Sequence, residues 1–226
     1  MLAAEKAVYL TIDDGPAEDF VQKVNFLNAK GILAIWFCMG EALERFSKEA
    51  IDAIKAGHII GNRSYDHADF SAISLHDARE QIERTDRIID ELYTKAETIR
   101  PSKLFRFPFM QHLQDKAFDD HFEGIQRVLD QLGYHQPSFE NMQYSERISG
   151  SLKSGLHVEC TWDTFDLERA DVVNERDDLQ ASNGNEIIMI HDWISVAPFK
   201  ALMDKLIAKN VVFQLPKEMS LQNAAM

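Results

Sequence analysis

Short apolar runs that alternate with amphipathic segments are the feature that most constrains the fold of this 226-residue chain. The runs are rich in β-branched and aromatic residues and mostly too short to be buried helices, so they predict strands. Strands separated by helices predict right-handed βαβ units and a parallel sheet. About seven such units close most naturally into a barrel, with the active site at the carboxyl ends of the strands. The predicted strands cover residues 7–12, 32–39, 58–60, 104–107, 158–162, 186–191 and 211–214.

Three helices are predicted from apolar periodicity, over residues 75–95, 118–132 and 198–209. The first begins with a capping-box pattern formed by Ser74 and Asp77. One stripe of this helix is expected to face the core, and it consists of Ala78, Ile82, Thr85, Ile89 and Leu92. The sequence contains no repeat, linker or low-complexity block, so we expect a single α/β domain.

Composition excludes several classes of protein. The chain has 37 Asp or Glu residues and 24 Lys or Arg residues, a formal charge of −13, which argues against nucleic acid as a partner. The longest apolar run, residues 32–39, is far shorter than the ~20 residues that span a membrane. Cys38 and Cys160 are too few for a disulfide framework or a Cys-based zinc module, and we expect buried free thiols, with one disulfide as the alternative.

Polar side chains follow five of the predicted strands at the point where each strand ends. Any one of these clusters could be a turn or a helix cap, but five of them at strand exits indicate an active site. The clusters are Asp13-Asp14-Gly15-Pro16, Asn62-Arg63-Ser64-Tyr65-Asp66-His67, Arg106-Phe107-Pro108-Phe109, Asp163-Thr164-Phe165-Asp166 and His191-Asp192-Trp193.

The residue types in these clusters suit hydrolysis by an activated water molecule. Asp13 and Asp14 are adjacent and can take different tasks, one binding a cation and the other acting as a base. Arg106 could clamp a carboxylate, and Asp166 could orient His191. A base, an acid, a cation site and orienting partners together indicate cleavage of an amide or ester.

The five clusters, in this order, resemble the motifs of the polysaccharide deacetylases with a NodB homology domain, carbohydrate esterase family 4. The first motif is Thr-Ile-Asp-Asp-Gly-Pro at residues 11–16, and the fifth is Met-Ile-His-Asp at residues 189–192. The match extends over residues 7–214 of a single domain covering 1–226. The resemblance implies a distorted (β/α)7 barrel, removal of acetyl groups from amino-sugar polymers, and a divalent metal, often zinc, held by an Asp-His-His triad.

The resemblance also implies a role for each matching residue. Asp13 would be the general base, tethered by Arg106, and His191 the general acid, tuned by Asp166. Asp14 and His67 would be metal ligands. The backbone N–H of Phe109 would help to stabilise the oxyanion, where the family has Tyr. The remaining motif residues assigned to the oxyanion and substrate side of the site are Pro108, Arg63 and Met189.

The departures from the family pattern concern the metal and the substrate pocket. Arg63 stands where the second motif normally has its first His, and a guanidinium has no lone pair to donate. Asp66, His58 or His76 could supply the missing ligand. If the 63–67 segment is helical, positions 63 and 67 share one face. Leu167 replaces the fourth-motif Trp and Met110 the Gly after the third motif, so we expect a non-standard pocket.

The function expected from these residues is hydrolysis of a non-peptide C–N bond, by an N-deacetylase of a carbohydrate. Two alternatives remain: a glycan-binding pseudoenzyme, which Arg63 favours, and a metal-independent amidohydrolase of a small amide or ureide. The compartment also stays open. Amino-sugar polymers lie mainly in the cell envelope, which favours export, whereas Glu5 and Lys6 interrupt any signal-peptide pattern at the N-terminus, which favours the cytoplasm.

Overall fold

The structure is a computed structural model that describes residues 6–109, 120–142, 155–165 and 184–219. The predictions for Asp166, Leu167 and Met110 therefore lie outside the described residues. The described strands are β1 (Ala7–Gly15), β2 (Ile35–Cys38), β3 (Ile59–Asn62), β4 (Trp162–Asp163), β5 (Glu186–His191) and β6 (Val212–Phe213). The described helices are α1 (Phe20–Ala29), α2 (Gly40–Arg45), α3 (Ser47–Lys55), α4 (Leu75–Lys95), α6 (Asp120–Gln131) and α9 (Val196–Ile207).

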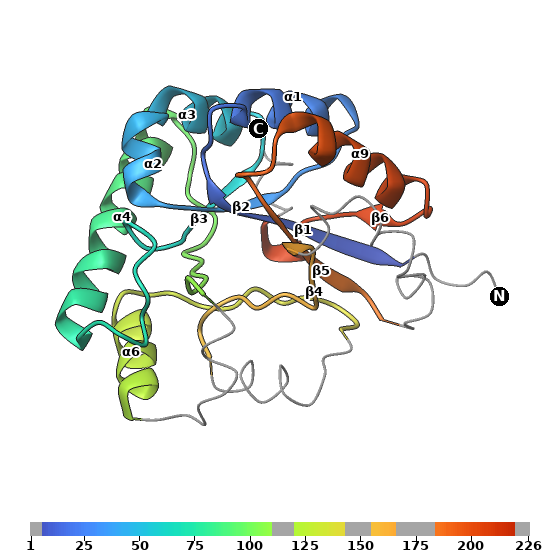
Figure 1. Cartoon of the computed structure of the whole chain (residues 1–226). Coiled ribbons are helices and arrows are strands. Elements are labelled where there is room, and N and C mark those ends of the chain that lie inside the picture. The colour runs from blue at the N-terminus through green and yellow to red at the C-terminus, as the bar shows by residue number, and fades with distance from the viewer. Residues whose placement is uncertain (1–5, 110–119, 143–154, 166–183, 220–226) are drawn as a thin grey trace.

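The strands form one parallel sheet with β1 at its centre. The order is β3-β2-β1-β5-β4, and β6 pairs with the first residues of β1. The helices lie outside the sheet, with α1 and α9 side by side and α2, α3 and α4 following one another around it (Figure 1). This arrangement confirms the prediction of an α/β fold with a parallel sheet.

Two segments without regular strand pairing, one around Phe105 and one over residues 158–161, close this sheet into a barrel. Asn62 of β3 forms a parallel bridge with Phe105, and the amide of Val158 donates to the carbonyl of Phe105 at 2.8 Å. The same segment then joins β5, because the amide of Thr161 donates to the carbonyl of Ile187 at 2.9 Å. Few hydrogen bonds close the ring at these joints, as in the distorted barrel that the family resemblance implies.

The predicted helix boundaries agree with the structure to within two residues. Helix α4 covers the predicted residues, and its cap is present, because the amide of Asp77 donates to Oγ of Ser74 at 3.1 Å. Helix α9 begins at Val196 rather than at Pro198. Proline is tolerated there because an N–H in the first turn of a helix has no partner within the helix.

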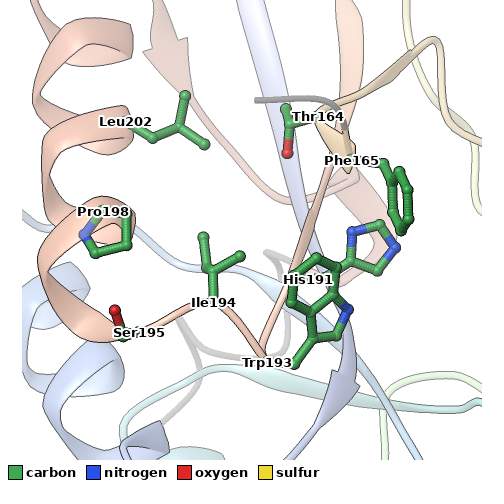
Figure 2. A pocket seen from close by; sticks show the side chains of 8 residues that line it. All are labelled: Thr164, Phe165, His191, Trp193, Ile194, Ser195, Pro198 and Leu202. Atoms are coloured by element: carbon green, nitrogen blue, oxygen red, sulfur yellow. The ribbon is translucent and has the colours of Figure 1, made fainter. Parts of the chain in front are cut away.

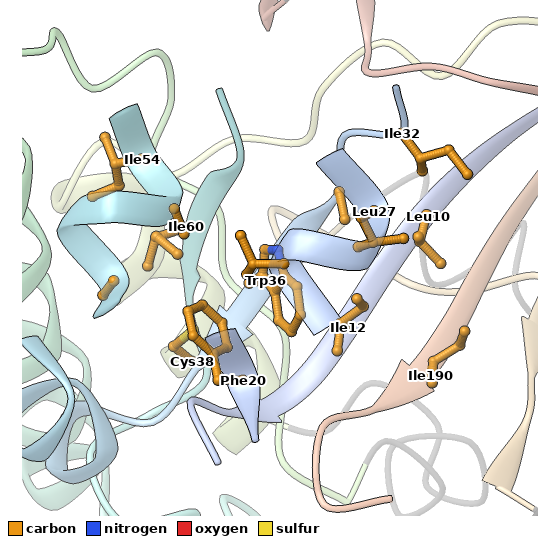
Figure 3. Packing of buried hydrophobic residues seen from close by; sticks show 14 of the residues in the cluster. Leu10, Ile12, Phe20, Leu27, Ile32, Trp36, Cys38, Ile54, Ile60 and Ile190 are labelled. Carbon is orange, nitrogen blue, oxygen red and sulfur yellow. The ribbon is translucent and has the colours of Figure 1, made fainter. Parts of the chain in front are cut away.

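The largest apolar cluster lies between the sheet and helices α1, α3 and α9 (Figure 3). Trp36 of β2 is fully buried at its centre and meets the ring of Phe20 edge-on at 4.6 Å. Both cysteines are free thiols, Cys38 buried and Cys160 partly exposed. Within the described residues, no helix combines the length and apolar character needed to cross a membrane.

Candidate active site

The carboxyl end of β1 carries two consecutive aspartates with different surroundings. Asp13 is fully buried and lies in register with Phe37 of β2 and with His191 of β5. The pairing with β2 is irregular between Asp13 and Gly15, and Asp14 has a left-handed backbone with φ of 64°. The irregularity re-aims the second carboxylate, so Asp14 contacts the loop after β3 while Asp13 stays inside the barrel.

Arg106 fixes one oxygen of Asp13. Its Nη1 donates to Oδ1 of Asp13 at 2.8 Å and to Oγ1 of Thr11 at 2.6 Å. Its other nitrogens donate to the carbonyls of Val158 and Glu159 at 3.0 and 3.2 Å. Oδ2 of Asp13 is also buried but accepts no hydrogen bond from the described residues. Asp13 is therefore hydrogen-bonded through Oδ1, while Oδ2 contacts the guanidinium of Arg63 at 3.0 Å as an ion pair.

Arg63 places a guanidinium between the two aspartates. Its Nε donates to Oδ1 of Asp14 at 3.0 Å, and its Nη1 donates to the carbonyl of Phe107. Nη1 also lies 3.0 Å from Oδ2 of Asp13. On the other side, Nε2 of His67 lies 3.1 Å from the same Oδ1 of Asp14. Arg63 and His67 thus converge on one carboxylate oxygen.

The segment from Arg63 to His67 is a loop, so the condition under which positions 63 and 67 would share a helix face is not met. Ser64 and His67 have left-handed backbones, with φ of 71° and 63°. Asn62 holds the loop, because its Oδ1 accepts from the amide of Ser64 at 2.9 Å while its Nδ2 donates to the carbonyl of Ile82 at 2.9 Å. The loop geometry, rather than helical spacing, brings the side chains of Arg63 and His67 to the same Oδ1 of Asp14.

Charges around Asp14 favour its ionised form. Burial alone would raise the pKa of this carboxyl group, but the contact with His67 and the charges of Arg63, His67 and His191 outweigh it. The pKa of Asp14 is therefore held well below its usual value. Asp14 is an anion paired with a fixed cation at any ordinary pH.

His191 lies at the end of β5 beside a pocket of about 470 Å³ (Figure 2). Its ring contacts the rings of Phe165 and Trp193, whose centroids lie 5.6 and 5.3 Å from the centroid of the His191 ring. Asp163 is a further neighbour: burial raises the pKa of this carboxyl group, and the charge of His191 opposes that shift. Asp166, the predicted partner of His191, lies outside the described residues.

The remaining predicted residues lie at the ends of neighbouring segments. Phe109 is 46% exposed, has a left-handed backbone with φ of 50°, and meets the ring of His67 edge-on at 4.6 Å. Pro108 is buried. Met189 is buried too, and its carbonyl accepts from the amide and hydroxyl of Thr164 at 3.0 and 2.9 Å.

Backbone strain is concentrated in this region. Seven described residues other than glycine have positive φ, and four of them belong to the motifs: Asp14, Ser64, His67 and Phe109. Such conformations cost free energy and typically cluster at functional sites. The strain thus supports, independently of the side chains, the assignment of this end of the barrel as the site.

Comparison with known proteins identifies the family. The model of the family described as polysaccharide deacetylase matches residues 3–139, more than half of the chain. The chain belongs to the polysaccharide deacetylase family. A curated relative, the peptidoglycan-N-acetylglucosamine deacetylase of Bacillus cereus, is 29% identical over 171 residues, which are 70% of this chain and 60% of that relative. The matched part of the chain therefore spans less than two thirds of this relative's length.

Solved structures of the family share the fold. A T48 deacetylase with bound substrate matches with a TM-score of 0.66 and 21% identity, over 96% of this chain and 92% of that chain. A mutant of a CE4-family pseudoenzyme matches with a TM-score of 0.62 and 20% identity, over 93% of this chain and 66% of that chain. The (β/α)7 barrel predicted from the sequence is the fold of these polysaccharide deacetylases.

The divalent metal of polysaccharide deacetylases does not fit the residues present here. Asp14 and His67 are two donors, and a catalytic zinc normally takes three protein ligands. Arg63 stands at the motif position of the third ligand. Its guanidinium would repel a metal ion and has no lone pair to donate to one. The described part of the chain holds no group of three or more His, Cys, Asp or Glu side chains placed to bind a metal ion.

The candidates for a replacement ligand are held elsewhere or face solvent. Nδ1 of His58 accepts from Nε1 of Trp36 at 3.2 Å, and its Nε2 contacts Oδ1 of Asn28 at 3.1 Å, so both ring nitrogens are engaged in the core. The side chain of His76 is 78% exposed, on the first turn of α4. Asp66 is exposed. None of the three joins Asp14 and His67.

A buried ion pair that was not predicted from the sequence lies next to the site. Nζ of Lys23 lies 2.6 Å from Oδ1 of Asp192 and 2.7 Å from Oδ1 of Asp19, and also donates to the carbonyl of Asp192. Asp192 follows His191, and its amide donates to the carbonyl of Asp13 at 2.8 Å. The available signal was a lysine among Phe20, Val24 and Leu27, the buried residues of α1.

Proposed function

We propose that this polysaccharide deacetylase family member is a carbohydrate N-deacetylase, which cleaves the acetamide C–N bond of an amino sugar. The observation that carries the proposal is the register of β1 and β5, which pairs Asp13 with His191 at the carboxyl end of the barrel. Asp13 offers a buried Oδ2 that accepts no hydrogen bond from the described residues but lies 3.0 Å from Nη1 of Arg63. A base beside a potential acid is the minimum that amide hydrolysis requires. The names of the curated relatives support this substrate class.

In the proposed reaction, Oδ2 of Asp13 takes a proton from water as the water oxygen attacks the acetyl carbon. Protonated His191 then gives its proton to the sugar nitrogen as the C–N bond breaks, so the products are acetate and a free amine. Arg106 keeps Asp13 in place through Oδ1. Asp166 remains the predicted orienting partner of His191.

The carbonyl oxygen needs a positive or hydrogen-bonding environment as negative charge develops on it. We assign this task to Arg63 and to the backbone N–H of Phe109. Nε and Nη1 of Arg63 are engaged, whereas its Nη2 forms no hydrogen bond with the described residues and is free to donate. We propose further that this chain binds zinc weakly or not at all.

An acetate-release assay on oligomers of N-acetylglucosamine, combined with elemental analysis of the purified protein, tests this function. We expect acetate release from protein that carries less than one equivalent of zinc. Release of acetate from small amides but not from oligomers would instead support the amidohydrolase alternative.

A glycan-binding pseudoenzyme is the second candidate, and the contacts of Arg63 favour it. The guanidinium lies 3.0 Å from oxygens of both Asp13 and Asp14, so it pairs with the carboxylate proposed as the base and with the one proposed as a metal ligand. Binding of N-acetylglucosamine oligomers without any release of acetate would favour this second function over the first.

A further inference from the structure

The pocket beside His191 is larger than an acetyl group requires. It lies between the ends of β4 and β5 on one side and helix α9 on the other, and has a volume of about 470 Å³. Figure 2 shows the rings of Phe165, His191 and Trp193 grouped on one side of the space, with Pro198 and Leu202 of α9 opposite. This volume falls within the roughly 300–1,000 Å³ range of small-molecule sites. The pocket therefore has room for a ring-sized ligand next to the proposed acid.

Two aromatic rings at this pocket are exposed. Phe165 is 54% exposed and Trp193 is 42% exposed, and their ring centroids lie 5.8 Å apart. Burial of an aromatic ring is favourable, so a ligand that covers these exposed rings would gain binding free energy. The two rings flank His191 rather than lying scattered over the surface, so a ligand that covers them also lies against the proposed acid.

The lining favours an uncharged ligand with both apolar and polar faces. Among the described residues that line the pocket, none carries a carboxylate, ammonium or guanidinium group. The hydroxyl of Ser195 adds a polar group, and it makes no capping hydrogen bond to α9, the helix that it precedes. A pyranose ring has this combination, with C–H groups on its faces and hydroxyls around its edge.

We propose that Trp193 and Phe165 form a sugar subsite, in which a neutral N-acetylhexosamine ring packs its apolar face on the indole of Trp193. This inference rests on the proposed function and deepens it, because it gives Trp193 the role of holding the sugar whose nitrogen receives the proton of His191. The subsite would fix the sugar rather than the acetyl group.

Tryptophan fluorescence tests this subsite without relying on activity. The chain has three tryptophans, and Trp36 and Trp162 are buried, so Trp193 is the exposed one. Titration with the β-1,4-linked pentamer of N-acetylglucosamine should give a saturable change in emission. Trp193→Phe should remove most of this change, and Trp193→Ala should raise the Kd at least about tenfold, the size of a loss at a binding hot spot.

The control is Ile99→Ala, which truncates an exposed apolar side chain that does not line the pocket. It should leave the Kd unchanged, and thermal unfolding of all variants should verify their fold. An unchanged Kd in Trp193→Ala, or no binding of the pentamer to the wild-type protein, would overturn the subsite. So would saturation by an N-acyl alkyl amine but not by the pentamer, because the pocket would then hold an acyl chain.

The two proposals fail in different ways. If the pentamer binds through Trp193 but releases no acetate, the subsite stands and the deacetylase function is wrong. If acetate is released and Trp193→Ala changes neither the Kd nor the KM, the function stands and the subsite is wrong.

Discussion

Arg63 contacts three parts of the site at once, through Asp13, Asp14 and the carbonyl of Phe107. A fixed guanidinium supplies positive charge, as a metal ion would. It does not, however, bring the pKa of a bound water near 7 as zinc can. At the scale of single residues, this side chain is therefore the main reason to expect chemistry that differs from that of a zinc deacetylase.

Arg63→His should create a zinc site. The change removes the repelling charge and adds an imidazole beside Asp14 and His67, which completes an Asp-His-His donor set. Calorimetric titration should show zinc binding by Arg63→His much tighter than micromolar, against about micromolar affinity at best in the wild type. We also expect Arg63→His to raise acetate release.

Arg63→Ala is the matched control for this prediction, because it removes the charge without adding a ligand. It should bind zinc more weakly than Arg63→His. Tight zinc binding by the unmodified protein would show that another residue supplies the third ligand and that our interpretation of Arg63 is wrong.

At the scale of elements, His58 couples β3 to β2 and α1 in its neutral form. Burial lowers the pKa of His58 to about 4 from its ordinary 6.5. Nδ1 accepts from the amide of Ala34 and from Nε1 of Trp36, both at 3.2 Å, so a proton on Nδ1 would face two donors. The contribution of His58 to stability is therefore complete above pH 6.5 and is lost as the pH falls toward 4 and below.

Urea unfolding between pH 7 and 4 tests this coupling. The difference in pKa corresponds to at most about 3 kcal/mol of stability at one site. His58→Gln keeps an acceptor for Trp36 but does not titrate, so its free energy of unfolding should fall less with decreasing pH. If the free energy of unfolding fell equally with decreasing pH in the wild type and in His58→Gln, the proposed role of neutral His58 would be contradicted.

The buried pair of Lys23 and Asp192 joins α1 to the turn after β5, close to both Asp13 and His191. Lys23→Met keeps most of the apolar stem but leaves the Asp192 carboxylate buried without its cation. We expect a loss of about 3–5 kcal/mol in the free energy of unfolding, the usual range for breaking a buried pair. Urea unfolding measures it.

The double variant Lys23→Met/Asp192→Asn provides the control, because it removes both charges and keeps an acceptor for the amide of Ala17. It should be more stable than Lys23→Met alone. A Lys23→Met protein as stable as the wild type would mean that the pair contributes little.

Elements whose pattern is local could be predicted, and features that depend on distant partners could not. Strands β1, β2, β3 and β5 and helix α4 follow from apolar periodicity and the Ser74 cap, whereas the predicted strand at 104–107 is a single bridge at Phe105 and the one at 158–162 overlaps β4 only at Trp162. The loop after β3 depends on Asn62, which bonds to Ile82 and Tyr134, 20 and 72 positions away. The partner of Lys23 likewise lies 169 positions away. The motifs identified Asp13 and Arg106, but no pattern in the sequence gives the angle at which Arg63 approaches them.

At the scale of the whole molecule, the barrel brings residues from distant parts of the chain to one end. Asp13 and His191 become neighbours through β1 and β5, and Arg106 reaches Asp13 from the segment that follows the Asn62–Phe105 bridge. The buried arginine also lies over the ring of Phe37, with its Cζ 4.3 Å from the ring centroid. The single-domain organisation stays a prediction.

The most direct test of the central claim is acetate release from N-acetylglucosamine oligomers, measured in the presence of a metal chelator. We expect the wild-type protein to release acetate at a rate that the chelator leaves unchanged, because Arg63 occupies the place of a metal. Asp13→Asn should lower kcat by roughly 100-fold or more, the scale of losing general-base catalysis, while thermal unfolding shows that it is folded. Abolition of activity by the chelator, or near-normal turnover by Asp13→Asn, would contradict the claim.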